Sequence, residues 1–353
     1  MSDTLTIHSK LKIYSVHFVE NLADVLLRHN DEGSFFLVDL NVFEQHKGIL
    51  TEYLPKERTI FIEVSENNKS MEFCSKLIED LVRRNIRRDQ SIVAIGGGIV
   101  QDISSFTASI LYRGIDWSFV PTTLLAQADS CIGGKTSINL GNKKNLVGSF
   151  YPPSQVYLDV SFLNSLPVAE LKSGIGEILH YYIYADSPQI VSLMEDYERI
   201  LETPALLAKH IRTSLAIKKE VIEVDEFDRG ERNKFNYGHT FGHALESLSN
   251  YEINHGQAVT LGMDIANYLS TRLGIMKNET YKELHGILSK NLPVFDMSNY
   301  AFGTYFEALA NDKKNIGNNL GCILAEKKGK LFKKNLAFDD KLKSLIMSYF
   351  KLI

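Results

Sequence analysis

The sequence predicts an α/β domain over residues 1–160, followed by an all-α domain over residues 161–353. Short apolar runs alternate with helix-like runs in the first half, which is typical of a parallel sheet covered by helices on both faces. After about Asp159, helix-like runs follow one another and strand signals become scarce. The length of 353 residues suits about two domains, each large enough for its own core.

The strands of the first domain are expected where short apolar runs end in polar residues or glycine. These runs cover residues 34–38, 59–64, 91–95 and 117–121. Residues 71–84 predict an amphipathic helix, because Phe73 and Leu77 fall on one face. Residues 100–111 predict a second helix, so strands and helices alternate along this half of the chain.

The second domain is expected to consist of helices. Its helix-like runs cover residues 168–186, 204–225, 238–249 and 256–273. Ligands of such proteins usually bind at the carboxyl ends of the parallel strands, where two domains meet. We therefore expect the functional residues to come both from the ends of the strands and from these helices.

Composition and charge indicate an ordinary globular protein. The formal net charge is −4, so the charge balance does not favour nucleic acid or an acidic membrane as a partner. The three cysteines, Cys74, Cys131 and Cys322, lack CxxC spacing, which argues against a disulfide framework and favours a reducing compartment. The first residues lack the apolar core of a signal peptide, and no apolar run approaches the ~20 residues of a membrane span. We therefore expect a cytoplasmic protein.

A glycine turn lies between a predicted strand and a predicted helix. Gly96, Gly97 and Gly98 would let the backbone approach a phosphate, and the following helix N-terminus would supply free N–H groups and positive potential. The pattern is not GxGxxG, so a tight strand-to-helix turn explains it as well as a phosphate site. Asp39, at another strand end, could hold a ribose hydroxyl or could simply end the strand.

A histidine-rich segment is the strongest local signal of chemistry. His239 and His243 are four residues apart, so they share one face of a helix, and His255 begins the next helix-like run. Two imidazoles and a carboxylate with an open position form a common catalytic zinc set, and Glu177 could supply the carboxylate. The metalloprotease pattern HExxH is absent. Spacing does not decide which two histidines would bind, and such a pair can also be ordinary surface or core residues.

Basic side chains that could bind phosphate or carboxylate groups are spread along the chain. Lys135 follows two glycines, and Lys144 lies beside Asn145 in a predicted loop. Arg232 could hold a carboxylate through two parallel hydrogen bonds, with Lys218 on the preceding helix. Each of these charges alone is most often a solvated surface group, and spacing does not show whether they converge.

The order of these motifs resembles the 3-dehydroquinate synthase family of sugar phosphate cyclases over nearly the whole chain. The matching motifs are GGG at 96–98, Asp102, YRG at 112–114, VPTTLLA at 120–126, Asp129, GGKT at 133–136, Lys144, Asn145, Glu177, Arg232, NYGHTFGHALE at 236–246, HGQAV at 255–259 and DKK at 312–314. Their order is unbroken. The resemblance implies a Rossmann-like NAD-binding α/β domain, an all-α domain that binds metal and substrate, and a homodimer.

The resemblance also implies a role for each matching residue. The ligands of zinc or cobalt would be Glu177, His239 and His255. The positions that contact NAD would be Asp39, Asn41, Glu66, Lys69, Gly97, Gly98, Asp102, Thr122 and Thr123. The phosphate pocket would be formed by Lys135, Asn145, Asn236, His243 and Lys313, joined by Arg113 of the neighbouring subunit. The substrate carboxylate would be held by Lys218 and Arg232, with Asp129, Lys144 and Asp228 near the hydroxyls.

The resembling enzymes are carbon–oxygen lyases that convert 3-deoxy-arabino-heptulosonate 7-phosphate to 3-dehydroquinate and phosphate. NAD oxidises a ring hydroxyl transiently, phosphate is eliminated, the ketone is reduced again, and the ring opens and closes by an aldol step. The metal acts as a Lewis acid. Alternatives are a cyclase for another sugar phosphate, for example an aminated one, a metal-dependent polyol dehydrogenase, and a nucleotide-binding protein without activity.

The sequence departs from the family pattern at three places. His180 stands three residues after the predicted metal-binding glutamate, where the family has a lysine that contacts the substrate. Gln101 occupies a position in the cofactor loop where glycine is usual, and Ser104 and Ser105 replace a small apolar pair. The His180 change leaves the exact substrate open. The Gln101 side chain would either crowd the cofactor pyrophosphate or point away from it.

Overall fold

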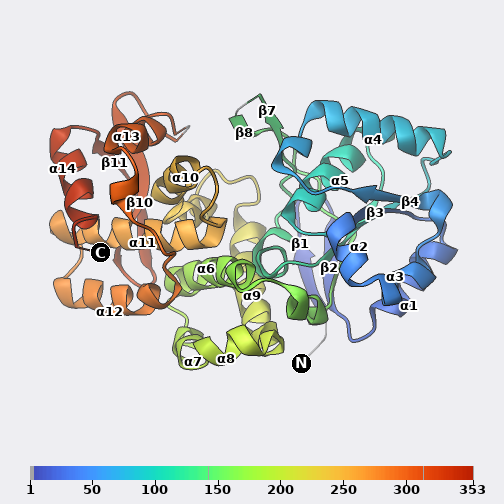
Figure 1. Cartoon of the computed structure of the whole chain (residues 1–353), viewed down its shortest axis with the longest axis horizontal. Coiled ribbons are helices and arrows are strands. Elements are labelled where there is room, and N and C mark those ends of the chain that lie inside the picture. Colours follow the sequence, from blue (N-terminus) through green and yellow to red (C-terminus); the bar gives the residue numbers. More distant parts are fainter. Residues whose placement is uncertain (1–3, 142, 313, 353) are drawn as a thin grey trace. The chain divides into compact units, whose positions relative to one another are not determined.

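The computed structural model describes residues 4–141, 143–312 and 314–352 (Figure 1). The chain separates into two compact units: unit 1 comprises Met1–Leu166 with Lys218–Phe227, and unit 2 comprises Pro167–Ile217 with Asp228–Ile353. The predicted domain boundary near residue 160 stays a prediction, and the segment Lys218–Phe227 is grouped with the sheet although its neighbours in sequence belong to unit 2. Within the described part of the chain, no helix is both long and apolar enough to cross a membrane.

Unit 1 is built on a seven-stranded sheet. In spatial order its strands are β1 (Thr4–His8), β2 (Ile13–Phe18), β9 (Gln155–Leu158), β6 (Trp117–Pro121), β5 (Ile92–Gly96), β3 (Phe35–Asp39) and β4 (Thr59–Ile62). All neighbours pair in parallel except β1 and β2. The strands β3, β5 and β6 are buried along their whole length, as expected for continuous apolar runs between two helical layers. The predicted parallel sheet is confirmed.

Helices cover both faces of this sheet (Figure 1). One side carries α4 (Met71–Arg83) and α5 (Gly98–Ile110), and the other carries α1 (Leu22–Asp31), α2 (Leu40–Gln45) and α3 (Lys47–Tyr53). Val25 and Leu26 of α1 join Phe36 and Val93 of the sheet in one core cluster. The apolar face of α4 is likewise buried, so the amphipathic pattern of the sequence decides which face of each helix meets the sheet.

The order of the strands reverses between β3 and β5, because β4 lies beyond β3 and β6 lies beyond β5. The carboxyl ends of these two strands therefore form a topological switch point, where open α/β sheets bind their ligands. Asp39 ends β3 and Gly96 ends β5, and a Cβ added to Gly96 would lie 3.2 Å from the Cβ of Asp39. The two predicted cofactor segments are thus close neighbours.

Unit 2 is mainly helical and is arranged around α11 (His255–Arg272), which is buried over most of its length. The other helices are α6 (Val168–Ala185), α7 (Gln189–Glu195), α8 (Tyr197–Glu202), α10 (His239–Leu248), α12 (Asn278–Leu288), α13 (Phe302–Ala310) and α14 (Asp340–Tyr349), and α9 (Ala208–Val224) runs from unit 2 into unit 1. The helix α11 contacts α6, α10, α12 and α14 (Figure 1). The predicted helical domain is confirmed.

Two glycines allow α6 and α11 to approach each other closely. A Cβ added to Gly256 would lie 1.7 Å from the carbonyl oxygen of Ser173, and a Cβ added to Gly176 would lie 2.1 Å from the carbonyl oxygen of Gly256. Any side chain at either position would therefore force the helices apart. Glu177 and His255 are adjacent in sequence to these glycines, so the close contact positions both side chains.

Unit 2 also contains an antiparallel hairpin that the sequence analysis did not predict. The strands β10 (Asn319–Lys327) and β11 (Lys330–Ala337) pair from Asn319 with Ala337 to Lys327 with Lys330. Six consecutive residues of β10 are buried, so the strand lacks the alternation of a half-buried strand that would have revealed it. The predicted all-α domain is therefore helical in the main, with this hairpin as an addition.

Candidate active site

A carboxylate and two histidines converge in unit 2. Glu177 lies on α6 with 2% exposure, His239 begins α10, and His255 begins α11. Glu177 Oε1 lies 3.2 Å from His255 Nε2 and 3.6 Å from His239 Nε2. Ligand atoms at about 2.0–2.1 Å from a tetrahedral zinc ion are about 3.3–3.4 Å apart. The observed separations are therefore those of a metal ligand set.

The second ring nitrogen of each histidine is held by an acceptor. The carbonyl oxygen of Tyr237 accepts from His239 Nδ1 at 3.2 Å, and Glu246 Oε2 accepts from His255 Nδ1 at 3.3 Å. Such an acceptor behind each metal-binding histidine fixes the tautomer and the ring orientation, and leaves Nε2 for the metal. Glu246 belongs to the matching motif, but the sequence analysis gave it no role, because its distance along the chain from His255 does not reveal the contact.

The residues present fit a divalent metal ion. Glu177 Oε1 is buried and forms no well-aligned hydrogen bond with any described residue. A buried carboxylate oxygen in this state favours a cation beside it, which either the protonated ring of His255 at 3.2 Å or a bound metal can supply. His239, His243 and His255 also bring ring nitrogens within 4.8 Å of one another. The geometry thus suits the predicted ligand set, and it also suits a set in which His243 replaces the carboxylate.

The two predicted histidine ligands differ in their electrostatics. Burial lowers the pKa of His239 to about 3, against the opposing effect of Glu177. Burial also lowers the pKa of His255, but the nearby carboxylates of Glu177 and Glu246 outweigh this effect and raise the pKa well above its usual value. His239 is therefore neutral and can donate its Nε2 lone pair, whereas His255 carries a proton that a metal must displace.

His180, where the sequence departs from the family, is fully buried on α6 one turn after Glu177. Its Nδ1 lies 4.0 Å from Glu177 Oε2, the carboxylate oxygen other than the one close to the two histidines. Its ring packs edge-on against Phe235 and His239. His180, which replaces the family lysine, therefore lies beside Glu177, His239 and His255, the expected metal ligands that we call the metal-ligand cluster. It is not a change at the surface.

Polar groups gather at the carboxyl ends of the central strands of unit 1. Asp39 Oδ1 accepts from the backbone N–H of Asn41 at 2.8 Å and caps α2. Thr122 follows β6, and its hydroxyl is buried without a hydrogen bond to any residue that the structure describes. The helix α5 begins at Gly98, where an added Cβ would meet nothing within 4 Å. Open space at a helix N-terminus and a spare hydroxyl fit a phosphate-bearing dinucleotide.

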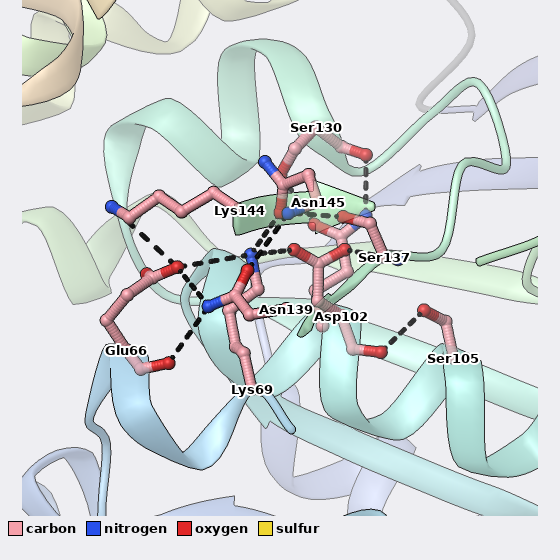
Figure 2. Close-up of polar contacts among 10 residues, drawn as sticks. Glu66, Lys69, Asp102, Ser105, Ser130, Ser137, Asn139, Lys144 and Asn145 are labelled. Carbon is pink, nitrogen blue, oxygen red and sulfur yellow. Dashed lines mark hydrogen bonds and ion pairs between the residues drawn. The ribbon is translucent and has the colours of Figure 1, made fainter. Parts of the chain in front are cut away.

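Lys69 lies at the centre of a polar network in unit 1 (Figure 2). Its Nζ is 2.8 Å from Asp102 Oδ2 and donates to Asn145 Oδ1 at 2.8 Å. Glu66 Oε1 is 3.7 Å from Lys144 Nζ and 3.9 Å from Lys69 Nζ. The network joins three residues predicted to contact NAD with two residues predicted to contact the substrate.

The two substrate residues of this network lie on the hairpin of β7 (Ile138–Leu140) and β8 (Lys143–Val147). Asn139 fastens the hairpin to the cofactor edge. Its side-chain amide donates to Glu66 Oε1 at 2.8 Å, and its Oδ1 accepts from the backbone N–H of Asn145 at 2.9 Å. The sequence analysis gave Asn139 no role, because its partners are distant in sequence and only the folded chain brings them together.

Lys218 and Asp129 form an ion pair in unit 1. Lys218 Nζ donates to Asp129 Oδ1 at 2.8 Å and to the carbonyl oxygen of Asp129 at 2.7 Å. Asp129 lies in a π-helical turn, Ala126–Ser130, and Lys218 is buried. The structure therefore places a residue predicted to bind the substrate carboxylate beside a residue predicted to lie near the hydroxyls.

The other predicted residues are divided between the two units. Unit 1 holds Gly97 and Thr123 at the cofactor edge, and the exposed residues Arg113 and Lys135. Unit 2 holds Asp228, Arg232, Asn236 and His243, of which Arg232 is buried and His243 is exposed. Lys313 lies outside the described residues. The convergence of these two sets on one substrate stays a prediction.

Sequence comparison relates the chain to a known family. It matches the family descriptions 3-dehydroquinate synthase N-terminal over residues 59–173 and 3-dehydroquinate synthase C-terminal over residues 174–315. A 3-dehydroquinate synthase of Dictyoglomus thermophilum is 35% identical over 350 residues, which cover 97% of this chain and 98% of that protein.

Solved structures share the fold. A crystal structure of 2-deoxy-scyllo-inosose synthase complexed with carbaglucose-6-phosphate, NAD+ and Co2+ has a TM-score of 0.86 at 24% identity, covering 98% of this chain and 99% of that chain. ValA, the 2-epi-5-epi-valiolone synthase of Streptomyces hygroscopicus subsp. jinggangensis, with NAD+ and Zn2+ bound, has a TM-score of 0.83 at 22% identity, covering 96% and 97%. These two likenesses show the fold alone. The two family matches, and the 35% identity over almost the full length, show that this chain belongs to the 3-dehydroquinate synthase family.

Proposed function

We propose that this chain is a 3-dehydroquinate synthase, a carbon–oxygen lyase that converts 3-deoxy-arabino-heptulosonate 7-phosphate to 3-dehydroquinate and phosphate. The observation that carries the proposal is the arrangement of Glu177 with the Nε2 atoms of His239 and His255 in a chain of this family. A polyol dehydrogenase on the same fold would need neither a phosphate pocket nor a pair of basic residues for a carboxylate.

In this proposal Glu177, His239 and His255 hold zinc or cobalt, the metals present in the two solved structures of similar fold. When bound, the metal supplies Lewis-acid polarisation of a substrate oxygen, and NAD supplies the acceptance and return of a hydride. The residues of unit 1 that would bind NAD lie at or after the ends of β3, β4, β5 and β6 or on α5. The backbone N–H groups at Gly98 would bind the NAD pyrophosphate, because the helix N-terminus carries positive potential.

The chain's own residues bind and orient the substrate. Lys218 would meet the substrate carboxylate as a point charge, and Arg232 would meet it with two parallel hydrogen bonds. The substrate phosphate would be held by Lys135, Asn145, Asn236, His243 and Lys313. With the phosphate fixed in this way, one of its own oxygens can take the proton beside the newly formed ketone. Positioning then replaces a dedicated protein base.

Arg113 supports the proposal of a homodimer. Tyr112 and Arg113 have φ angles of 52° and 68°, in the left-handed region that costs a non-glycine residue about 1–2 kcal/mol. Such strain is often stored at functional sites, and Arg113 is exposed. We expect this arginine to reach the substrate phosphate of a neighbouring subunit. Light scattering of the active protein should show a dimer, and a fully active monomer would contradict this role.

Phosphate release and NADH absorbance, followed in the same reaction, test the proposed function. The purified protein is given 3-deoxy-arabino-heptulosonate 7-phosphate, NAD, and zinc or cobalt. We expect phosphate to be released without net NADH, because the hydride returns to the product. Accumulation of NADH without phosphate would indicate a polyol dehydrogenase. Absence of both signals, from protein that binds NAD and metal, would contradict the proposal.

The burial of His180 beside Glu177 favours a second candidate, a cyclase for a related sugar phosphate such as an aminated analogue. An imidazole is shorter than the family lysine and is largely neutral near neutral pH unless perturbed. The variant His180→Lys separates the candidates. If the wild-type protein is a 3-dehydroquinate synthase, H180K should keep its activity on the usual substrate. Phosphate release from the aminated substrate alone would establish the second candidate.

A further inference from the structure

Gln101 makes a two-point contact across unit 1. It lies on α5 directly before Asp102, and 6% of its surface is exposed. Its Nε2 donates to the carbonyl oxygen of Ser130 at 2.6 Å, and Ser130 Oγ donates to its Oε1 at 2.5 Å. The Ser130 end of the contact is labelled in Figure 2. Ser130 thus forms hydrogen bonds with both the nitrogen and the oxygen of the buried Gln101 amide, and these bonds fix the orientation of the side chain.

The contact explains how glutamine is accommodated where the family usually has glycine. The side chain is directed to Ser130, and the space beside Gly98 stays open, because a Cβ added there would meet nothing within 4 Å. The departure therefore does not close the turn that precedes α5. It adds a link between two segments that a glycine at this position has no side chain to make.

Ser130 ends the π-helical turn that carries Asp129. Gln101 donates to the carbonyl of Ser130, and Lys218 donates to the carbonyl and to the carboxylate of Asp129. Two consecutive carbonyls are therefore held by side chains from two other segments of unit 1. Single π-helical turns are rare and occur frequently at functional sites, which suits a turn whose geometry is fixed in this way.

We propose that Gln101 is a positioning residue for the reaction, which acts through Ser130 to hold Asp129, and with it Lys218, in place for the substrate carboxylate. This inference rests on the proposed function, which assigns the carboxylate to Lys218. Because Lys218 is joined to Asp129 at two atoms, a displaced turn displaces the lysine as well. The contact also ties this turn to α5, the helix that begins at the predicted pyrophosphate site.

The kinetic test compares Gln101→Gly, which restores the usual family residue, with Ser130→Ala. Gln101→Gly removes both hydrogen bonds, so it should raise KM for the sugar phosphate about tenfold. Ser130→Ala removes only the hydroxyl hydrogen bond and keeps the backbone carbonyl that accepts from Gln101, so it should raise KM by about threefold. The kcat and the Kd for NAD should change by less than about twofold, because the contact serves substrate binding. The double variant should be no worse than Gln101→Gly alone, because that variant already removes both hydrogen bonds.

Matched variants show whether the contact itself is responsible. Ser105 is a buried polar residue on the same helix, and its hydroxyl donates to the carbonyl oxygen of Asp102 within α5 at 3.2 Å. Ser105→Ala should therefore leave KM within about twofold of the wild type, as expected for a change away from the contact. Gln101→Glu keeps the size of the side chain but loses the amide donor, and it should behave like Gln101→Gly.

Hydrogen exchange in the substrate-free protein tests the contact independently of the proposed function. Backbone amides of residues 126–133 should exchange about tenfold faster in Q101G, less so in S130A and not in S105A, because only Q101G loses both hydrogen bonds to the turn. This faster exchange is expected even if the wild-type protein releases no phosphate. Absence of phosphate release would count against the proposed function, and it would leave the inference about the contact standing. Wild-type KM and wild-type exchange in Q101G would overturn the inference. A weaker Kd for NAD that accounts for the whole loss of activity would also overturn it.

Discussion

The two units differ in how their charged side chains are paired in the absence of ligands. In unit 1 the charged groups near the cofactor edge are already paired, Lys69 with Asp102 and Lys218 with Asp129, each at 2.8 Å. In unit 2, Glu177 Oε1 is buried, and among the described residues it has no well-aligned hydrogen-bond donor. The residues of unit 1 are paired with one another before a ligand binds, whereas Glu177 of unit 2 faces two histidine rings, of which His255 must give up its proton to a metal.

This difference indicates how each unit should respond to mutation. Removing one member of a buried ion pair leaves an uncompensated charge, so residues of unit 1 should contribute to stability as well as to binding. The metal-ligand cluster of unit 2 should instead lose metal while the protein stays folded, because its order depends on the helices that carry it.

Glu177→Gln should have the largest effect, because it keeps the shape of the side chain but removes the charged ligand. Activity should fall at least about a thousandfold, since the metal supplies several kcal/mol of transition-state stabilisation. Metal content after dialysis against zinc, measured by mass spectrometry, should fall with the activity. The control is Glu195→Gln, which alters an exposed carboxylate of the same unit. An E177Q protein that retained both metal and activity would contradict the assignment of Glu177 as a metal ligand.

Lys69→Ala should lower the free energy of unfolding by about 3 kcal/mol, because Asp102 and Glu66 lose their buried cationic partner. Urea denaturation of the ligand-free protein measures this change, and NAD binding should weaken in the same variant. Lys76 is a matched control, since it pairs with Glu72 but is well exposed, and Lys76→Ala should leave the stability unchanged. Equal stability of K69A and wild type would show that the unit 1 network is not a stabilising one.

Glu246→Gln should weaken zinc binding about 10- to 100-fold, the usual effect of removing a carboxylate that orients a metal-binding histidine. Activity should return when zinc is added in excess, because the ligands themselves are intact. Glu252→Gln, at an exposed position in the following turn, is the control. A loss of activity that excess zinc does not restore would assign Glu246 a role other than orienting His255.

The smallest effect is expected at His285, which forms an ion pair with Asp264 within unit 2. Its Nδ1 lies 2.8 Å from Asp264 Oδ2, and this hydrogen bond raises the pKa of His285 above its usual value. A raised pKa in the folded state stabilises the protein below the unfolded-state pKa, and this contribution is lost as the pH rises through the folded-state pKa.

His285→Gln should therefore destabilise the protein below about pH 6 and have less effect above about pH 8. The difference should stay below about 1 kcal/mol, because the ring is partly exposed to solvent. Urea denaturation at the two pH values checks this sign. A larger effect at high pH would contradict it, and a loss of zinc from this variant would show that the pair is not independent of the metal-ligand cluster.

Much of the fold could be predicted because its central elements carry strong local patterns. The strands β3, β5 and β6 are continuous apolar runs, and glycines mark the start of α5. The strands β1, β2 and β9 were not predicted, and both the edge strand β1 and its neighbour β2 mix buried and exposed residues. The hairpin of β10 and β11 was not predicted, since β10 is a buried run without alternation and β11 is exposed at most positions, so neither shows the alternating pattern of a half-buried strand.

The candidate site was predictable only in part. Spacing alone left open which two of His239, His243 and His255 would bind a metal, and the family resemblance selected His239 and His255. The structure turns the Nε2 atoms of these two toward Glu177. Glu246 and the contact of Gln101 with Ser130 could not be predicted, because local patterns do not encode contacts between distant segments.

The central claim is that Glu177, His239 and His255 are the protein ligands of the catalytic metal. Anomalous scattering from crystals grown with zinc tests this claim most directly. We expect one peak at about 2.0–2.2 Å from a Glu177 carboxylate oxygen and from the Nε2 atoms of His239 and His255. A peak bound by His239, His243 and His255 without Glu177, or no peak at a zinc concentration that supports full activity, would contradict it.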